Sequence, residues 1–286
     1  MADVLDSAEP GDRFHDYCLW EYTPVASVAG KLRSSTLLWH SFEALAAPRM
    51  LREMVEALRQ ALGNGRIVWG VKKFAERCVW ELYFYDYARL QREVSIERVL
   101  SILQPFASSE LRLSAARPYF MFSLDLDTEL AERRVLDQVS VYLGNPGSTV
   151  SSGLSYQLTS AGLRFDNLYY FFDARAEWDA VVGKVAASAH LDLDRIVLDE
   201  ILWPELRDCG VIVVANKKYN DGVYFSRIRV DQLIAFLDRL KYPEAIRSFV
   251  RNHKDRLDHM LYDVGVDYRM LDGRIEIIKS AYYGVV

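Results

Sequence analysis

Basic side chains recur on segments with the alternating pattern of β-strands, and together they could bind an anion. Lys72, Lys218, Arg227 and Lys279 are each placed on such a segment. A lysine inside an aromatic environment is costly to bury unless it meets an anion. Each residue alone could instead extend from a strand end to water, so the anion-site hypothesis requires several of them to meet. Tyrosines on similar segments could shield a cation and donate to phosphate oxygens, namely Tyr169, Tyr224, Tyr282 and Tyr283.

Two acids occupy comparable positions. Glu81 alternates with large apolar residues in the run RCVWELYFY (77–85), and Asp125 does so in PYFMFSLDLD (118–127). An acid at such a position could orient a nucleophile and take its proton, or hold a cationic group through both oxygens. The alternative is that Asp125 only pairs with an interior cation while Glu81 lies at a solvated rim.

Common catalytic motifs are missing from the sequence. It contains no G-x-G-x-x-G motif after a strand, no P-loop and no G-x-S-x-G motif, which argues against dinucleotide, P-loop nucleotide and α/β-hydrolase chemistry. The histidines lack zincin spacing, and His253 and His259 are expected on the surface. No two aspartates are adjacent, so we expect no aspartate-rich Mg²⁺ site and no dedicated metal site at all.

The elements that must position these residues are clearest near the C-terminus. Apolar runs at 211–216 and 223–228 flank KKYNDG, which predicts a hairpin because Asn and Gly tolerate a positive φ. Helical spacing follows over 230–240 and 242–258, and a second hairpin is predicted from 262–270 and 275–283.

The same kinds of element precede this region. Helices are predicted over 47–62, 95–103, 176–187 and 193–206, and a strand over 118–127. Hairpins are predicted from 66–74 with 77–85, turning near 75–76, and from 154–159 with 163–172. Residues 128–143 are ambiguous, and we favour a turn followed by a strand. Residues 14–39 show no clear period.

Strands that are joined by tight turns must be antiparallel. Because these strand pairs are separated by helices, the sequence predicts an α+β fold: a closed antiparallel β-barrel of repeated hairpins surrounded by helices. In such a barrel Trp80, Leu82 and Phe84 would face the helices, whereas Glu81 and Tyr83 would face inward. An ordinary open sheet is the alternative.

Composition limits the class of protein. The 286 residues are 51% hydrophobic, with a net charge of −5 and three cysteines far apart, so we expect a globular protein with free thiols and no nucleic-acid partner. Residues 1–12 are polar and acidic and are expected to be a disordered leader before a single domain over 13–286. Without a signal peptide or a long apolar run, we expect a cytoplasmic protein without a membrane partner, as a monomer or weak homodimer.

Several segments resemble the peptide prenyltransferases of cyanobactin biosynthesis. They are VYFSRI (223–228), DQL (231–233), AIRSFV (245–250), Met260, RIEIIKSAYY (274–283) and FSLDLDTELAE (122–132). The resemblance implies an α-β-β-α prenyltransferase barrel that transfers a prenyl group from its diphosphate to a side chain of a ribosomal, often macrocyclic, peptide. It also implies assistance by Mg²⁺ without an aspartate-rich motif.

The resemblance assigns roles to individual residues. It places Lys218, Lys279 and Tyr283 near the diphosphate, where Lys72 and Arg227 would add charge. It places Ile212 where the family sets isoprenoid length, which favours dimethylallyl diphosphate with geranyl diphosphate as the alternative. The other residues expected in the prenyl pocket are Tyr169, Phe225 and Leu261.

The chain also departs from this family. The family's usual glutamate falls near Val68, and its usual arginine on the next strand falls near Glu81. We therefore expect Glu81 and Asp125 to act on the acceptor, with an Arg guanidinium as the most plausible nucleophile. A non-catalytic barrel that binds an apolar ligand or a peptide, and a small-molecule aromatic prenyltransferase, are the alternatives.

Overall fold

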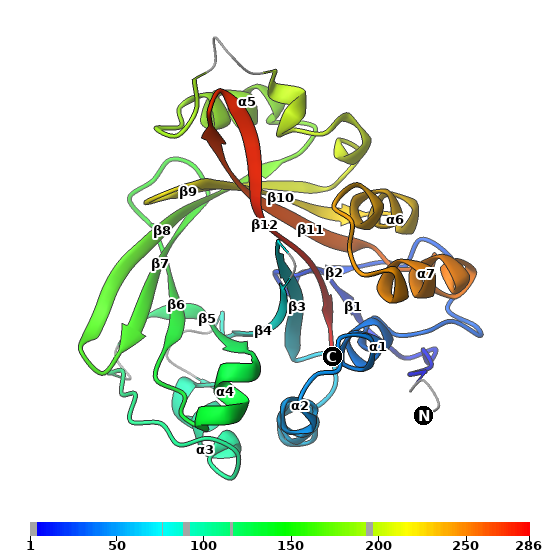
Figure 1. The fold of residues 1–286 in the computed structure, drawn as a ribbon, viewed down its shortest axis with the longest axis vertical. Helices are drawn as coiled ribbons and strands as arrows, with labels where there is room; N and C mark the ends of the chain where they lie inside the picture. Colours follow the sequence, from blue (N-terminus) through cyan, green and yellow to red (C-terminus); the bar gives the residue numbers. More distant parts are fainter. Residues whose placement is uncertain (1–4, 76, 88–91, 115–116, 193–196) are drawn as a thin grey trace.

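The protein is described by a computed structural model that covers residues 5–75, 77–87, 92–114, 117–192 and 197–286. Ten strands of this described chain form one closed barrel with the order β10-β11-β12-β3-β4-β5-β6-β7-β8-β9 (Figure 1). The strands are β3 (Ile67–Phe74), β4 (Arg77–Tyr85), β5 (Tyr119–Leu126), β6 (Val139–Gly144), β7 (Ser152–Thr159), β8 (Gly162–Asp173), β9 (Val211–Lys217), β10 (Asp221–Ile228), β11 (Tyr262–Leu271) and β12 (Arg274–Val285).

Every neighbouring pair of barrel strands is antiparallel. The last strand closes the ring on the first, since β12 pairs with β3 in a register that sets Ala281 opposite Lys72. A closed ring leaves no unpaired sheet edge. The predicted closed barrel is therefore confirmed, and the open sheet is excluded.

Helices lie on the outside of the ring of strands (Figure 1). The described residues form α1 (Ser35–Ala44), α2 (Arg49–Leu62), α3 (Ile96–Leu103), α4 (Thr128–Arg133), α5 (Trp178–Ala186), α6 (Val230–Arg239), α7 (Glu244–Asn252) and α8 (Lys254–Leu257). Their apolar faces and the outward side chains of the strands make one large core, which includes Trp80, Leu82 and Phe84 as expected. A separate, smaller apolar cluster lies inside the barrel and contains Val213, Ala215, Tyr224, Ala281 and Tyr283. Alternation along each strand thus separates an outer core from an inner surface.

Two sequence predictions about helices were wrong. Residues 128–133 form α4 instead of the favoured turn, and Asp127 accepts a hydrogen bond from the Leu130 amide at the start of this helix. The strand predicted after the turn is present as β6. In place of a helix over 193–206 there are two short 3₁₀ turns at Leu198–Glu200 and Pro204–Leu206, and residues 193–196 lie outside the described chain. Pro204 lacks the amide hydrogen that a continuous helix needs.

The described residues near the N-terminus contact the segment that precedes α1. Asp6 and Asp12 both pair with Arg33, at 3.0 and 2.7 Å, and Ser7 bridges to Leu32. Residues 1–4 of the expected leader, and Glu76 of the predicted 75–76 turn, lie outside the described residues. After this segment, β1 (Phe14–His15) and β2 (Glu21–Tyr22) pair with each other.

His259 is fully buried rather than on the surface. Its ring packs edge-on against Phe14 at 5.4 Å, and burial lowers its pKa to about 4. No helix in the described ranges is long and apolar enough to cross a membrane.

Candidate active site

Charged side chains gather inside the barrel near the end where β11 turns into β12. Three lysines and three carboxylates point inward there and are called the charged layer below: Lys72, Lys217, Lys279, Glu81, Asp125 and Asp267. Cross-strand register explains the grouping, because Glu81 lies opposite Asp125 and Lys279 lies opposite Asp267.

Two of the lysines share a single carboxylate oxygen. Lys217 Nζ lies 2.6 Å and Lys279 Nζ lies 2.7 Å from Asp267 Oδ2. Burial alone would raise the pKa of Asp267, but the two lysines hold it well below its ordinary value. Burial, with Lys217 and Lys72 nearby, lowers the pKa of Lys279 despite its contact with Asp267. This group, the Lys217–Lys279–Asp267 cluster, carries one more positive than negative charge and would be stabilised by a further anion.

The opposite balance holds around Lys72. Its ammonium lies 3.0 Å from Glu81 and 2.5 Å from Asp125, so one cation serves two acids. Burial alone would lower the pKa of Lys72, but the acids raise it above its usual value. Glu81 is further fixed by hydrogen bonds from the hydroxyls of Tyr83 (2.6 Å) and Ser123 (2.7 Å). The interior therefore presents one wall with a surplus of positive charge and one, the acidic wall, with a surplus of negative charge.

Strand glycines let large side chains lie close to the barrel wall. A Cβ added to Gly265 would lie 2.1 Å from the Tyr224 ring, and one on Gly222 would lie 2.7 Å from Asp267 Oδ1. Gly222 was predicted to serve the hairpin turn, but it lies within β10 and has no positive φ. Its lack of a side chain instead makes room for Asp267.

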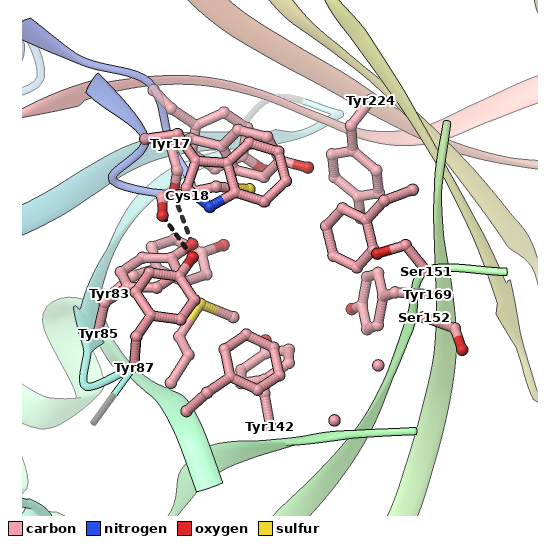
Figure 2. Close-up of a pocket in the computed structure, with 17 residues that line it drawn as sticks. Tyr17, Cys18, Tyr83, Tyr85, Tyr87, Tyr142, Ser151, Ser152, Tyr169 and Tyr224 are labelled. Atoms are coloured by element: carbon pink, nitrogen blue, oxygen red, sulfur yellow. Dashed lines mark hydrogen bonds between the residues drawn. The ribbon is translucent and has the colours of Figure 1, made fainter. Parts of the chain in front are cut away.

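An aromatic cavity of about 200 Å³ adjoins the charged layer (Figure 2). Tyr224 links the two, because its ring lines the cavity while its hydroxyl donates to Asp267 (3.0 Å) and accepts from Lys217 (3.1 Å). The tyrosines lining the cavity are Tyr17, Tyr83, Tyr85, Tyr87, Tyr142, Tyr169, Tyr224 and Tyr283. Such walls exclude water and present aromatic faces that stabilise a positive charge.

The loop between β1 and β2 contributes to the far side of this cavity. The hydroxyls of Tyr85 and Tyr87 donate to the carbonyl oxygens of Tyr17 and Cys18 (Figure 2). The loop is fastened to the barrel by Arg227, which lies 2.9 Å from the Asp16 carboxylate. Part of the wall of the cavity is therefore formed by residues far from the barrel strands in sequence.

A buried carboxyl completes this attachment and gives a testable pH dependence. Asp263 accepts hydrogen bonds from the Tyr17 amide (2.9 Å), the Arg227 amide (3.2 Å) and the Ser226 hydroxyl (2.5 Å). Burial, together with the nearby Asp16 carboxylate, raises the pKa of Asp263 from 3.8 to about 8. Between these values the folded protein keeps a proton that the unfolded chain has lost.

The free energy of unfolding should therefore fall as pH rises from 4 to 8, by at most about 1.4 kcal/mol per pH unit. The Asp263→Asn variant should show a flatter dependence, and it should be more stable than the wild type at pH 8. Urea unfolding at pH 5, 6.5 and 8 measures both slopes. Parallel slopes for the two proteins would contradict the assignment to Asp263.

The structure brings together most of the site residues predicted from the sequence. Lys72, Glu81, Asp125 and Lys279 lie in the charged layer. Tyr169 and Tyr283 line the aromatic cavity. Their inward position follows from strand alternation, and their roles in catalysis remain predictions.

Five predicted site residues lie elsewhere. Lys218 is in the β9–β10 turn with its ammonium 4.9 Å from the centre of the Tyr219 ring, because β9 ends one residue earlier. Arg227, at a bulge with φ +65°, pairs with Asp16 away from the lysines. The other three do not line the aromatic cavity: Ile212 and Phe225 face each other in the outer core, and Leu261 is hydrogen-bonded through its backbone to Tyr22.

Other interior residues were not predicted to act in the site. Lys217 and Asp267 could have been found from strand alternation, since Val213, Ala215 and Lys217 share a face of β9. Tyr17 offered no such signal, because the loop that carries it has no periodic pattern.

The interior acids do not fit a dedicated Mg²⁺ site. Among the described residues, no three His, Cys, Asp or Glu side chains gather as metal ligands would. Glu81, Asp125 and Asp267 are each engaged by a lysine instead.

Comparison with known proteins connects this architecture to one fold. No protein-family model matches the sequence, and no curated protein matches it either. The structure is similar to the crystal structure of AnaPT from Neosartorya fischeri, with a TM-score of 0.55 and 10% sequence identity over 88% of this chain and 92% of that one. At this identity the likeness concerns the fold. The chain has the closed antiparallel α-β-β-α barrel fold of the prenyltransferases.

Proposed function

We propose that this protein transfers a prenyl group from an isoprenoid diphosphate to an acceptor. The observation that carries the proposal is the Lys217–Lys279–Asp267 cluster, which has a surplus of positive charge and lies directly beside a tyrosine-lined cavity. The likeness to AnaPT, an aromatic prenyltransferase, supports it.

The two parts of the site match the two parts of such a donor. Lys217 and Lys279 would bind the diphosphate, and the tyrosines would surround the apolar chain. When the bond between C1 and the diphosphate oxygen breaks, the pair of electrons leaves with pyrophosphate and an allylic cation remains. Lysines already fixed in place stabilise the leaving group. Electrostatic stabilisation of this kind is typically the largest contribution to catalysis. The aromatic walls protect the cation from water.

The resemblance to cyanobactin enzymes supports a peptide side chain as the acceptor, and the acidic wall favours a cationic one. Glu81 and Asp125 outnumber their single lysine, and they line a second cavity of about 230 Å³ whose lining also includes Asp127 and Asp137. A guanidinium would replace the ammonium of Lys72 as their partner. Its nitrogen would form the new bond to C1 and lose a proton to Glu81.

Binding of the donor tests the coarser proposal. Calorimetry with the non-reactive dimethylallyl and geranyl thiolodiphosphates should detect saturable binding of at least one, and a screen for prenylated products should follow. We expect dimethylallyl to be the preferred donor. Mg²⁺ should be included in these assays as an assisting ion. Binding of prenyl alcohols but not of the diphosphate analogues would instead indicate a non-catalytic barrel.

The Glu81→Gln variant tests the acceptor side. It should abolish turnover with little change in donor affinity, because Glu81 contacts Lys72 and not the two lysines that would hold the diphosphate. Mass spectrometry of peptides that differ only in one Arg, Trp or Tyr should show preferential modification of the Arg peptide.

The matched control is Glu129→Gln. This acid lines the same second cavity, but its side chain is 68% exposed and pairs with Arg133. We expect nearly full activity from it. Full activity in Glu81→Gln, or modification of the Trp or Tyr peptides alone, would refute the assignment of Arg as the acceptor.

A further inference from the structure

The Tyr17 side chain forms part of the wall of the aromatic cavity. Its ring lines the aromatic cavity and packs against Tyr283 with the ring centres 5.6 Å apart. Figure 2 shows Tyr17 and Cys18 on one side of the cavity and Tyr169 and Ser152 on the other. Tyr17 therefore forms part of the boundary of the cavity, although it belongs to the N-terminal loop.

The charged layer fixes the direction of the chain. A diphosphate held by Lys217 and Lys279 would leave the chain to run along Tyr224 into the cavity. The Tyr17 amide binds Asp263, four residues along β11 from Asp267, which is about 13 Å at the usual rise of a strand. The diphosphate end and the Tyr17 end of the site are thus separated by a fixed length of barrel wall.

Tyr17 is held rigidly enough to limit that length. Its amide donates to Asp263 and its carbonyl oxygen accepts from the Tyr85 hydroxyl. The preceding residue, Asp16, is 1% exposed and is paired with Arg227. Because the backbone is fixed on both sides, the ring can move aside only by changing its own rotamer and leaving the Tyr283 ring against which it packs.

We propose that Tyr17 sets the length of isoprenoid that the protein accepts. The proposal depends on the proposed prenyl transfer and adds the residue that determines its donor specificity. Ile212 and Phe225 do not serve this purpose, since both side chains lie in the outer core between the barrel and its helices. The residue that would limit the chain thus comes from outside the barrel strands.

The experiment compares binding of dimethylallyl and geranyl thiolodiphosphates by calorimetry. In the Tyr17→Ala variant the ratio of the two dissociation constants should shift at least tenfold toward geranyl, because the cavity is lengthened. Tyr17→Phe should keep the ratio of the wild type, since the ring remains.

The matched control is Tyr22→Ala. Tyr22 lies on the same N-terminal segment and fastens it through Leu261, but it does not line the aromatic cavity. Its loss should leave the ratio within twofold of the wild type, because the contacts of Tyr17 with Asp263 and Tyr85 remain. If the wild type binds one of the analogues, an unchanged ratio in Tyr17→Ala, or an equal shift in Tyr22→Ala, would overturn the role of Tyr17 and leave the proposed donor intact. Failure of the wild type to bind either analogue would overturn the proposed function itself.

Discussion

Replacing Lys217 by alanine should weaken binding of an isoprenoid diphosphate by roughly 10- to 100-fold and reduce turnover at least as much. A hydrogen bond to a charged group contributes about 1.5–3 kcal/mol, and each 1.4 kcal/mol is a tenfold change in affinity. The variant also removes the surplus positive charge, because Lys279 and Asp267 would then form a neutral pair. Lys279→Ala should have a similar effect for the same reason.

Lys218→Ala is the matched control for this prediction. The two lysines are adjacent in sequence, but Lys218 lies in the turn and packs over Tyr219 instead of pointing inward. Its removal should change affinity less than twofold. Calorimetry with dimethylallyl thiolodiphosphate and steady-state kinetics measure the two effects. A loss in Lys218→Ala as large as that in Lys217→Ala would mean that the diphosphate binds outside the barrel.

The difference between Lys217 and Lys218 also shows where sequence reasoning reached its limit. Alternation predicted the inward face of β4 correctly, because Glu81 and Tyr83 lie within a long, regular strand. Alternation from Val213 and Ala215 points Lys217 inward only if the strand extends to it, so the choice between the two consecutive lysines depends on the residue at which the turn begins. That residue is set by register with the neighbouring strand, which is a long-range property.

Bulges limited the prediction in the same way. Strict alternation would put Phe120 on the outer face with Phe122, but the register of β5 shifts between Tyr119 and Met121, and Phe120 lines the cavity. At Arg227 a second bulge turns the side chain to Asp16. An irregularity of one residue reverses the face that a side chain occupies, and a single sequence does not reveal it.

The N-terminal loop could not be placed for a different reason. Its contacts join residues that are far apart in the chain, such as Asp16 with Arg227 and Tyr17 with Asp263. No local sequence pattern indicates such long-range pairings. The barrel itself could be predicted because each hairpin has a local signal, whereas the closure of its aromatic cavity depends on tertiary contacts.

The largest effect on stability should come from Asp267→Asn. The substitution leaves two buried ammonium groups without their shared carboxylate, and breaking a buried ion pair costs about 3–5 kcal/mol. The lysines hold the pKa of Asp267 well below its ordinary value, so its contribution is fully present above the unfolded pKa of 3.8 and is lost only in stronger acid. The stability difference between variant and wild type, measured by urea unfolding, should therefore be constant with respect to this group from pH 5 to pH 8.

Pyrophosphate should restore much of the stability that Asp267→Asn loses. An anion that binds the folded state raises the melting temperature by mass action, and the variant offers it two lysines without competition from a carboxylate. The control is Asp221→Asn, a buried acid on the neighbouring strand whose Oδ1 accepts from Asn216 rather than from a lysine ammonium. Melting curves with and without pyrophosphate should show a clearly larger increase for Asp267→Asn than for the wild type or the control. Equal increases in all three proteins would mean that the two interior lysines do not form the anion site.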